Sequence, residues 1–237
     1  PGAHFFDIDA VSDKTNPSLH MLPTGSMFAE QMGLLGIGAD TEVVIYDTKG
    51  LFSAPRAWWM FRVFGHRSVK VLNGGLPAWL AADRSTTDAK SPVGVPANPF
   101  SAQYCLEWVA DKDDVAIHLA EDSARVVDAR SASRFAGAEA EPRPGVRPGH
   151  MPGARNVHYA KMTTGEPAVL APEGDLRVLF DAVGIDHSTP VVTTCGSGIS
   201  ACLLALALTE VHPRPIAVYD GSWAEWGADP NCPVERA

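Results

Sequence analysis

The chain has 237 residues, of which 46% are hydrophobic, so it can form one large or two ordinary domains with a sizeable core. A formal net charge of −9, from acidic residues scattered along the sequence, argues against a general binder of polyanions such as nucleic acids. No apolar stretch is long enough to span a membrane, so we expect no membrane partner.

The four cysteines, at positions 105, 195, 202 and 232, have neither metal-ligand spacing nor a Cys-x-x-Cys motif. The histidines show no ligand-like spacing either, so we expect no metal site. A reducing compartment is the simplest setting for unpaired thiols. We therefore expect a cytoplasmic protein, with a mitochondrial location as the alternative.

Short apolar strands alternate with helical patterns along the chain. In the first half, strands are expected at residues 43–46 and 69–72, on either side of a helix at about residues 54–64. The second half has expected strands at residues 126–128, 191–194 and 216–219, and helices at about 132–135, 176–183, 199–209 and 223–226. This alternation predicts an α/β fold with parallel sheets flanked by helices, in which ligands bind beyond the carboxyl ends of the strands.

The two halves share three segments in the same order. Pro-Gly-Ala occurs at residues 1–3 and 152–154, an apolar strand runs into Asp47 and into Cys195, and residues 72–79 resemble residues 219–226. A repeat of this size predicts a duplicated domain. We expect domains at 1–84 and 104–237, joined by a linker at 85–103 that is rich in Pro, Ser, Thr and Ala. The first half has no counterpart of residues 126–150, so its domain is expected to be incomplete at the N-terminus.

Cys195 stands where the buried strand at residues 191–194 gives way to small residues and then to an apolar helix. Backbone N–H groups at a helix N-terminus form an anion site, which would stabilise a thiolate. Gly196 and Gly198 allow the backbone to curl around the sulfur. The alternative is that Cys195 is a small core residue, and this second interpretation is the preferred one for Cys202, inside the apolar helix.

Phosphatases that form a cysteinyl phosphate also carry a cysteine in such a loop. They place an arginine six residues later to clamp the phosphoryl oxygens, and here that position is Ala201. No basic residue occurs between Cys195 and Arg214, so a phosphate dianion would lack its bidentate partner. Sulfur transfer is therefore favoured over phosphatase activity.

The segment Cys195-Gly-Ser-Gly-Ile-Ser-Ala201 resembles the active-site loop of the 3-mercaptopyruvate sulfurtransferases, in the tandem-domain rhodanese superfamily. Val-Thr is usual in that family where Ile199 and Ser200 stand here. Thiosulfate-using relatives carry basic residues directly after the cysteine, so Gly196 and Ser197 favour 3-mercaptopyruvate. The resemblance also implies two rhodanese-like domains, of which the first, with Asp47 in place of the cysteine, carries no sulfur.

The resemblance further implies roles for individual residues. Arg134 and Arg143, nine positions apart, match the two substrate-binding arginines of the family, and the loop residues Gly196, Gly198, Ile199 and Ser200 would complete the binding site. Asp9, His20 and Ser197 match a triad that would handle the substrate proton, together with Cys195 as the nucleophile. Without the resemblance, each arginine reads as a surface residue paired with Glu139 or Glu141, and His20 as a loop histidine.

The function implied is sulfur transfer from 3-mercaptopyruvate through a Cys195 persulfide to a thiol acceptor, with release of pyruvate. Thioredoxin, a small thiol or cyanide would serve as acceptor, and no cofactor is needed because the cysteine itself carries the sulfur. Two alternatives stay open. One is a thiosulfate sulfurtransferase, and the other is a non-catalytic module for sulfur relay or binding.

Overall fold

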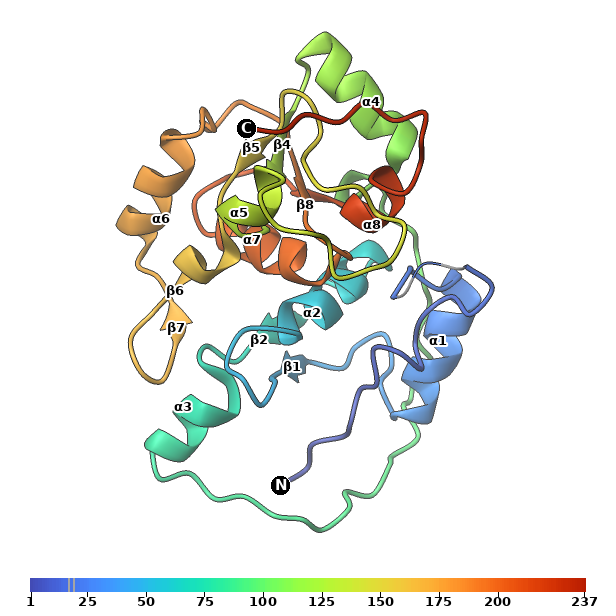
Figure 1. Ribbon diagram of the computed structural model, residues 1–237. Coiled ribbons are helices and arrows are strands. Elements are labelled where there is room, and N and C mark those ends of the chain that lie inside the picture. The colour runs from blue at the N-terminus through green and yellow to red at the C-terminus, as the bar shows by residue number, and fades with distance from the viewer. Residues whose placement is uncertain (17, 19) are drawn as a thin grey trace. The chain divides into compact units, whose positions relative to one another are not determined.

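Figure 1 shows the computed structural model of the protein, which describes residues 1–16, 18 and 20–237. The chain forms two compact units, residues 1–106 with 165–169 and residues 107–164 with 170–237. Each contains parallel strands with helices packed against them, so the predicted α/β fold is confirmed. The domain limits expected from the sequence, 1–84 and 104–237, stay a prediction.

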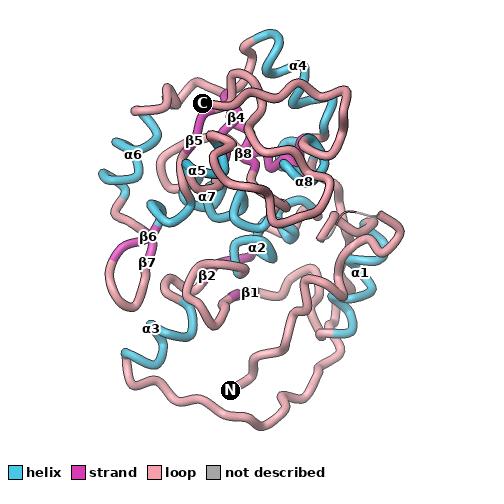
Figure 2. Tube along the Cα trace, viewed as in Figure 1, coloured by secondary structure: helices cyan, strands magenta, loops and turns pink. Residues whose placement is uncertain are grey.

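The first unit is built around helix α2 (Ala54–Val63), which packs on two parallel strands, β1 (Val43–Ile45) and β2 (Val69–Val71). Two further helices belong to this unit, α1 (Gly25–Leu34) and α3 (Gly75–Ala81). The expected linker at 85–103 contains no helix or strand, apart from an isolated bridge between Gly38 and Pro99, and Figure 2 shows it as a long loop.

Aromatic side chains form the core of the first unit. Phe28 of α1 stacks on Phe64 with 4.5 Å between ring centroids, and it meets Phe61 of α2 edge to face at 5.3 Å. All three rings are buried. Ring pairs in these arrangements stabilise a core beyond the area that they bury, which fixes α1 against α2.

The second unit holds a five-stranded parallel sheet in the order β3-β9-β8-β4-β5. The strands are β3 (Val109–Ala110), β4 (Arg125–Asp128), β5 (Arg155–Asn156), β8 (Val191–Thr194) and β9 (Ala217–Tyr219). Helices α4 (Lys112–Glu121) and α8 (Ser222–Trp226) cover one face, where Val115, Val126, Val192 and Trp223 share a buried cluster. Figure 1 shows α6 (Glu173–Asp181) and α7 (Ile199–Thr209) on the other side of the strands.

Several short elements complete the second unit. They are α5 (Ala132–Phe135), the 3-10 helices η1 (Leu106–Trp108) and η2 (Tyr159–Met162), and the paired strands β6 (Thr163–Thr164) and β7 (Val169–Leu170). η1 and β7 extend by one residue each into segments grouped with the first unit.

The sheet register brings three strand ends to one edge. Asp128 at the end of β4 pairs with Thr194 at the end of β8, and Thr193 pairs with Val218 of β9. All four residues of β8 are buried, as expected for a central parallel strand rich in β-branched residues. The residues that follow β4, β8 and β9 therefore meet at the carboxyl edge, where ligands bind in such sheets.

Every strand expected from the sequence is present, with ends that shift by at most one residue, and the bounds of α5 and α7 match their predictions. The helix expected at 176–183 begins earlier, at Glu173, and ends at Asp181. Helices α1, α3 and α4 were not predicted. The start of α4 is set by a capping box, in which Asp111 and Asp114 exchange side-chain to backbone hydrogen bonds.

Two general properties follow from the described part of the chain. No helix there combines the length and the apolar character needed to cross a bilayer. Within the same residues, no group of three or more His, Cys, Asp or Glu side chains is arranged to hold a metal ion.

Candidate active site

Cys195 lies directly after β8, at the carboxyl edge of the second unit's sheet. The loop that follows it ends at Gly198, which has φ 78° and is the N-cap of α7. A side chain at this left-handed position would be strained, so glycine lets the loop turn directly into the helix. The sequence-predicted arrangement of strand, cysteine, tight loop and helix is therefore confirmed.

The loop combines buried and accessible positions. Gly196 and Gly198 are buried, whereas Ser197, Ile199 and Ser200 are half-buried. Since the first N–H groups of a helix have no partner within the helix, the start of α7 can supply donors to a negative charge at this loop. These five residues thus stand where the predicted binding loop requires them, and their roles stay predictions.

Cys195 itself is more deeply buried than its proposed reactivity suggests, with 1% of the residue exposed. Its surroundings are nevertheless polar. The Cys195 N–H donates to the hydroxyl of Ser222, and Cys195 lies close enough to Arg134 to be among the groups that raise the pKa of Arg134. Cys202 is also buried, within α7, and its Sγ donates to the carbonyl of Gly198. This geometry supports the core interpretation for Cys202 and a polar setting for Cys195.

Arg134 is placed by α5, whose N-cap Ser131 accepts a hydrogen bond from the Arg134 N–H. Its guanidinium lies against the cysteine loop, because a Cβ atom built on Gly196 would be 3.0 Å from Arg134 Nη2. Arg134 Nη2 also donates to Glu141 Oε2 at 2.5 Å. Burial alone would lower the pKa of Arg134, but the hydrogen bond and charge of Glu141 outweigh it, so this pKa is raised above its usual value.

Arg143 reaches the same loop from another direction. Its Nη1 donates to the carbonyl oxygen of Gly196 at 3.4 Å. In the described part of the chain, no acidic side chain forms an ion pair with Arg143. The structure therefore brings both predicted arginines to Gly196, one with a carboxylate partner and one without.

A buried charge network supports Arg134, and the sequence analysis anticipated only one of its contacts, the pairing of Arg134 with Glu141. Glu141, with a side chain 3% exposed, binds Arg130 Nη1 at 2.8 Å as well as Arg134. Arg130 in turn holds Asp128 through Nε and Nη2 at 2.7–3.1 Å and lies over the ring of Trp223. Two cations and two anions balance, which is the condition for burying charges at tolerable cost. Acidic residues at 128 and 141 flanking Arg130 and Arg134 were the available signal.

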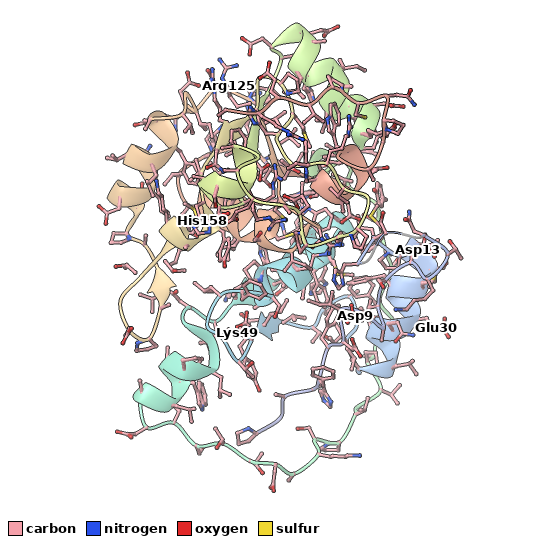
Figure 3. The ribbon with its side chains drawn as sticks, viewed as in Figure 1. Asp9, Asp13, Glu30, Lys49, Arg125 and His158 are labelled. Carbon is pink, nitrogen blue, oxygen red and sulfur yellow. The ribbon has the colours of Figure 1, made fainter. Side chains whose placement is uncertain are left out.

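Asp9 and His20 belong to the first unit, and Figure 3 labels Asp9. Asp9 Oδ1 lies 2.7 Å from His20 Nδ1, a distance typical of an ion pair, although the angle is not that of a hydrogen bond. His20 has φ 66°, and its carbonyl accepts from the buried Arg56 side chain. The structure thus brings the first two members of the predicted triad together. Ser197 lies in the second unit, and its link to His20 stays a prediction.

Comparison with known proteins agrees with this geometry. The model of the Rhodanese-like domain matches residues 1–82 and 111–229. The chain belongs to the rhodanese-like family. It is 46% identical over 228 residues to the 3-mercaptopyruvate sulfurtransferase of Rattus norvegicus, covering 95% of this chain and 76% of that protein. It is 40% identical over 233 residues to the thiosulfate sulfurtransferase of Cricetulus griseus, covering 95% and 76%.

A solved structure extends the comparison to three dimensions. The crystal structure of SseA from Escherichia coli, described with the rhodanese fold and catalytic mechanism of 3-mercaptopyruvate sulfotransferases, superimposes with a TM-score of 0.80. The two chains are 38% identical, and the match covers 94% of this chain and 82% of the other. These relatives place this rhodanese-like protein among the sulfurtransferase enzymes.

The first rhodanese-like repeat shows how such a loop holds a negative charge. Asp47, at the position that matches Cys195, follows β1, and Lys49 in the same loop is labelled in Figure 3. The Asp47 carboxylate accepts four backbone N–H groups at 2.8–2.9 Å, those of Lys49, Phe52, Ser53 and Ala54. These four N–H groups form an anion cradle, which the Asp47 side chain itself occupies. This supports the prediction that the first repeat carries no sulfur.

Because the cradle binds the Asp47 carboxylate, we expect a substitution at Asp47 to lower the stability of the protein. An Asp47→Ala variant leaves four N–H groups without their acceptor, so we expect the free energy of unfolding to fall by about 1–3 kcal/mol. Urea denaturation followed by circular dichroism measures the change. Asp88→Ala, at an exposed position of the loop 85–103, is the control and should lie within about 0.5 kcal/mol of the wild type. Equal stability of the two variants would show that the cradle contributes nothing.

Proposed function

We propose that this enzyme takes the sulfur of 3-mercaptopyruvate onto Cys195 and passes it to a thiol acceptor, with release of pyruvate. The observation that carries the proposal is the convergence of Arg134 and Arg143 on Gly196, the residue next to Cys195. Two planar guanidinium groups suit a carboxylate with an adjacent keto oxygen, because each can donate parallel hydrogen bonds to neighbouring oxygens.

In the first half-reaction the Cys195 thiolate attacks the thiol sulfur of the substrate. The bond between C3 and sulfur breaks, and its electron pair moves into the enolate of pyruvate. A proton delivered to C3 then gives pyruvate and leaves a persulfide on Cys195. N–H groups of the loop and of the start of α7 stabilise the negative charge on sulfur, as four N–H groups hold the Asp47 carboxylate in the other repeat.

Ser197 is the proposed donor of that proton. It is half-buried and two residues from Cys195, so its hydroxyl can contact a molecule bound at the loop. His20 would polarise the hydroxyl and Asp9, 2.7 Å from His20 Nδ1, would orient the imidazole. The triad thus draws one residue from the second unit and two from the first.

In the second half-reaction a nucleophilic acceptor, either a thiolate or cyanide, attacks the outer sulfur of the persulfide, and the Cys195 thiolate leaves. Reduced thioredoxin, a small thiol or cyanide has the required nucleophilicity. A reducing compartment such as the cytoplasm keeps Cys195 and a thiol acceptor in the reduced form that the reaction needs. The two half-reactions share no ternary complex, so ping-pong kinetics are expected. No cofactor takes part.

The test is a donor comparison on the wild-type enzyme. We expect pyruvate release from 3-mercaptopyruvate and, after donor treatment without acceptor, a mass gain of one sulfur atom on the peptide that contains Cys195. A kcat/KM for thiosulfate equal to or above that for 3-mercaptopyruvate would support the alternative activity, which the Cricetulus griseus relative keeps open. Partner binding without turnover of either donor would instead support a non-catalytic module.

A further inference from the structure

Ser222, at the start of α8, has a backbone conformation that disfavours a side chain. Its φ is 52°, in the left-handed region where residues with a Cβ atom are strained. Among the described residues, three other non-glycine positions share a positive φ, namely His20, Asp83 and Asp122, and none of these is buried. Ser222 is fully buried. Strain that persists in a buried residue calls for a compensating contact.

That contact is made by the Ser222 hydroxyl, which joins two strand ends. Its Oγ accepts the Cys195 N–H at 3.2 Å and donates to the carbonyl of Tyr219, the last residue of β9, at 2.8 Å. The next two residues add backbone hydrogen bonds to the same segment. The Trp223 N–H donates to the Cys195 carbonyl at 2.9 Å and the Ala224 N–H donates to the Gly196 carbonyl at 3.0 Å. The start of α8 thus holds the peptide groups on both sides of Cys195.

The first repeat makes the same turn without a side chain. Gly75 is the residue that matches Ser222, and its φ of 53° is nearly identical. The Leu76 N–H donates to the Asp47 carbonyl at 3.0 Å, as Trp223 does to Cys195. A Cβ atom on Gly75 would lie 2.6 Å from that carbonyl oxygen. A glycine at this position is therefore enough to make the turn and its backbone hydrogen bond. These two features do not explain why the second repeat has a strained serine there.

We propose that Ser222 is a positioning residue for Cys195. By accepting the Cys195 N–H, its hydroxyl fixes the peptide plane between Thr194 and Cys195, which sets the direction of the thiol and of the loop N–H groups that follow. This inference rests on the proposed function, because it assigns to Ser222 the orientation of the nucleophile. It also explains the difference between the repeats, since Asp47 transfers no sulfur and needs no such orientation.

Two substitutions separate this role from a purely structural one. Ser222→Ala and Ser222→Gly both remove the hydroxyl, but the glycine also relieves the left-handed strain. We therefore expect the Gly variant to unfold at a higher urea concentration than the Ala variant. Both should form the persulfide about tenfold more slowly than the wild type at saturating 3-mercaptopyruvate, with KM unchanged because Arg134 and Arg143 are untouched. Rapid quench followed by mass spectrometry of the Cys195 peptide gives the rate.

Asp83→Gly is the matched control, because Asp83 is exposed in the first unit and has φ 53°. It should gain stability from the same relief of strain and keep the wild-type rate. A Ser222→Gly variant with the wild-type rate, or rates that follow stability across the two Ser222 variants, would overturn the proposal.

A second readout does not need the donor. Labelling of Cys195 by iodoacetamide, followed on its peptide at fixed pH, should be slower in both Ser222 variants than in the wild type. If the wild type releases no pyruvate, the proposed function fails while the labelling rates still decide the role of Ser222. Equal labelling in all three proteins would overturn that role.

Discussion

A Cys195→Ser variant is expected to lose pyruvate release from 3-mercaptopyruvate by on the order of 10⁴-fold or more, the effect of removing a covalent nucleophile. A serine hydroxyl at this position cannot form a persulfide. It also cannot ionise near neutral pH in the way that a thiol can, so the N–H groups of the loop would have no anion to stabilise. Pyruvate release followed by coupled reduction to lactate measures the loss.

The control is Cys105→Ser, which removes a half-buried thiol from the first unit. This variant should keep wild-type turnover, and its Cys195 peptide should still gain one sulfur atom when treated with 3-mercaptopyruvate. The Cys195→Ser protein should gain none on any peptide. Turnover by Cys195→Ser at more than a few per cent of the wild-type rate would refute covalent sulfur transfer through this residue.

The sequence predicted the cysteine loop because its elements have strong local signals. Val191 to Thr194 is a β-branched run, and Ile199 to Thr209 is an apolar helix preceded by glycine, so both elements have the bounds expected. The site's position followed from a general property of parallel sheets, in which chemistry collects at the carboxyl ends of the strands. These inferences needed no knowledge of contacts between distant residues.

The contacts that support the site could not be predicted in the same way. The sequence offered Glu141 as a partner of Arg134, but its second pairing, with Arg130, depends on how the loop after α5 folds back, and spacing along the chain does not specify that path. The positive φ of Ser222 is equally hidden, because serine gives no sign of a left-handed conformation in the way that glycine does. The Asp47 cradle was missed for a similar reason, since its four donors are backbone groups that every sequence carries.

The charges around Gly196 predict different consequences for the two arginines. The Arg134 charge is countered by Glu141, whereas Arg143 has no acidic partner within the described residues. Arg143 therefore supplies the uncompensated positive charge at the loop, and we expect it to bind the substrate carboxylate. An Arg143→Gln variant should raise KM for 3-mercaptopyruvate by about 10- to 100-fold, the loss of one charge-assisted hydrogen-bond pair, with little change in stability.

Arg134→Gln should behave differently, because it leaves Glu141 short of one of its two cationic partners in a buried network. We expect it to lower both the urea midpoint and the activity, because the network then holds one negative charge without a balancing cation. The loss of stability should stay below about 3–5 kcal/mol, the cost of an unpaired buried charge, since Arg130 still binds Glu141. Arg155→Gln, at an exposed arginine of β5, is the control for loss of a positive charge and should change neither KM nor stability. Steady-state kinetics and urea denaturation on the three variants give the comparison.

Thiosulfate separates carboxylate binding from general attraction of anions, because it carries negative charge but no carboxylate or keto oxygen. If Arg143 recognises the carboxylate through its planar fork, Arg143→Lys should recover only part of the lost affinity for 3-mercaptopyruvate, since an ammonium cannot donate two parallel hydrogen bonds. The same substitution should matter less for thiosulfate. Full recovery by lysine with both donors would mean that Arg143 acts as a point charge, and an unchanged KM in Arg143→Gln would remove it from the binding site.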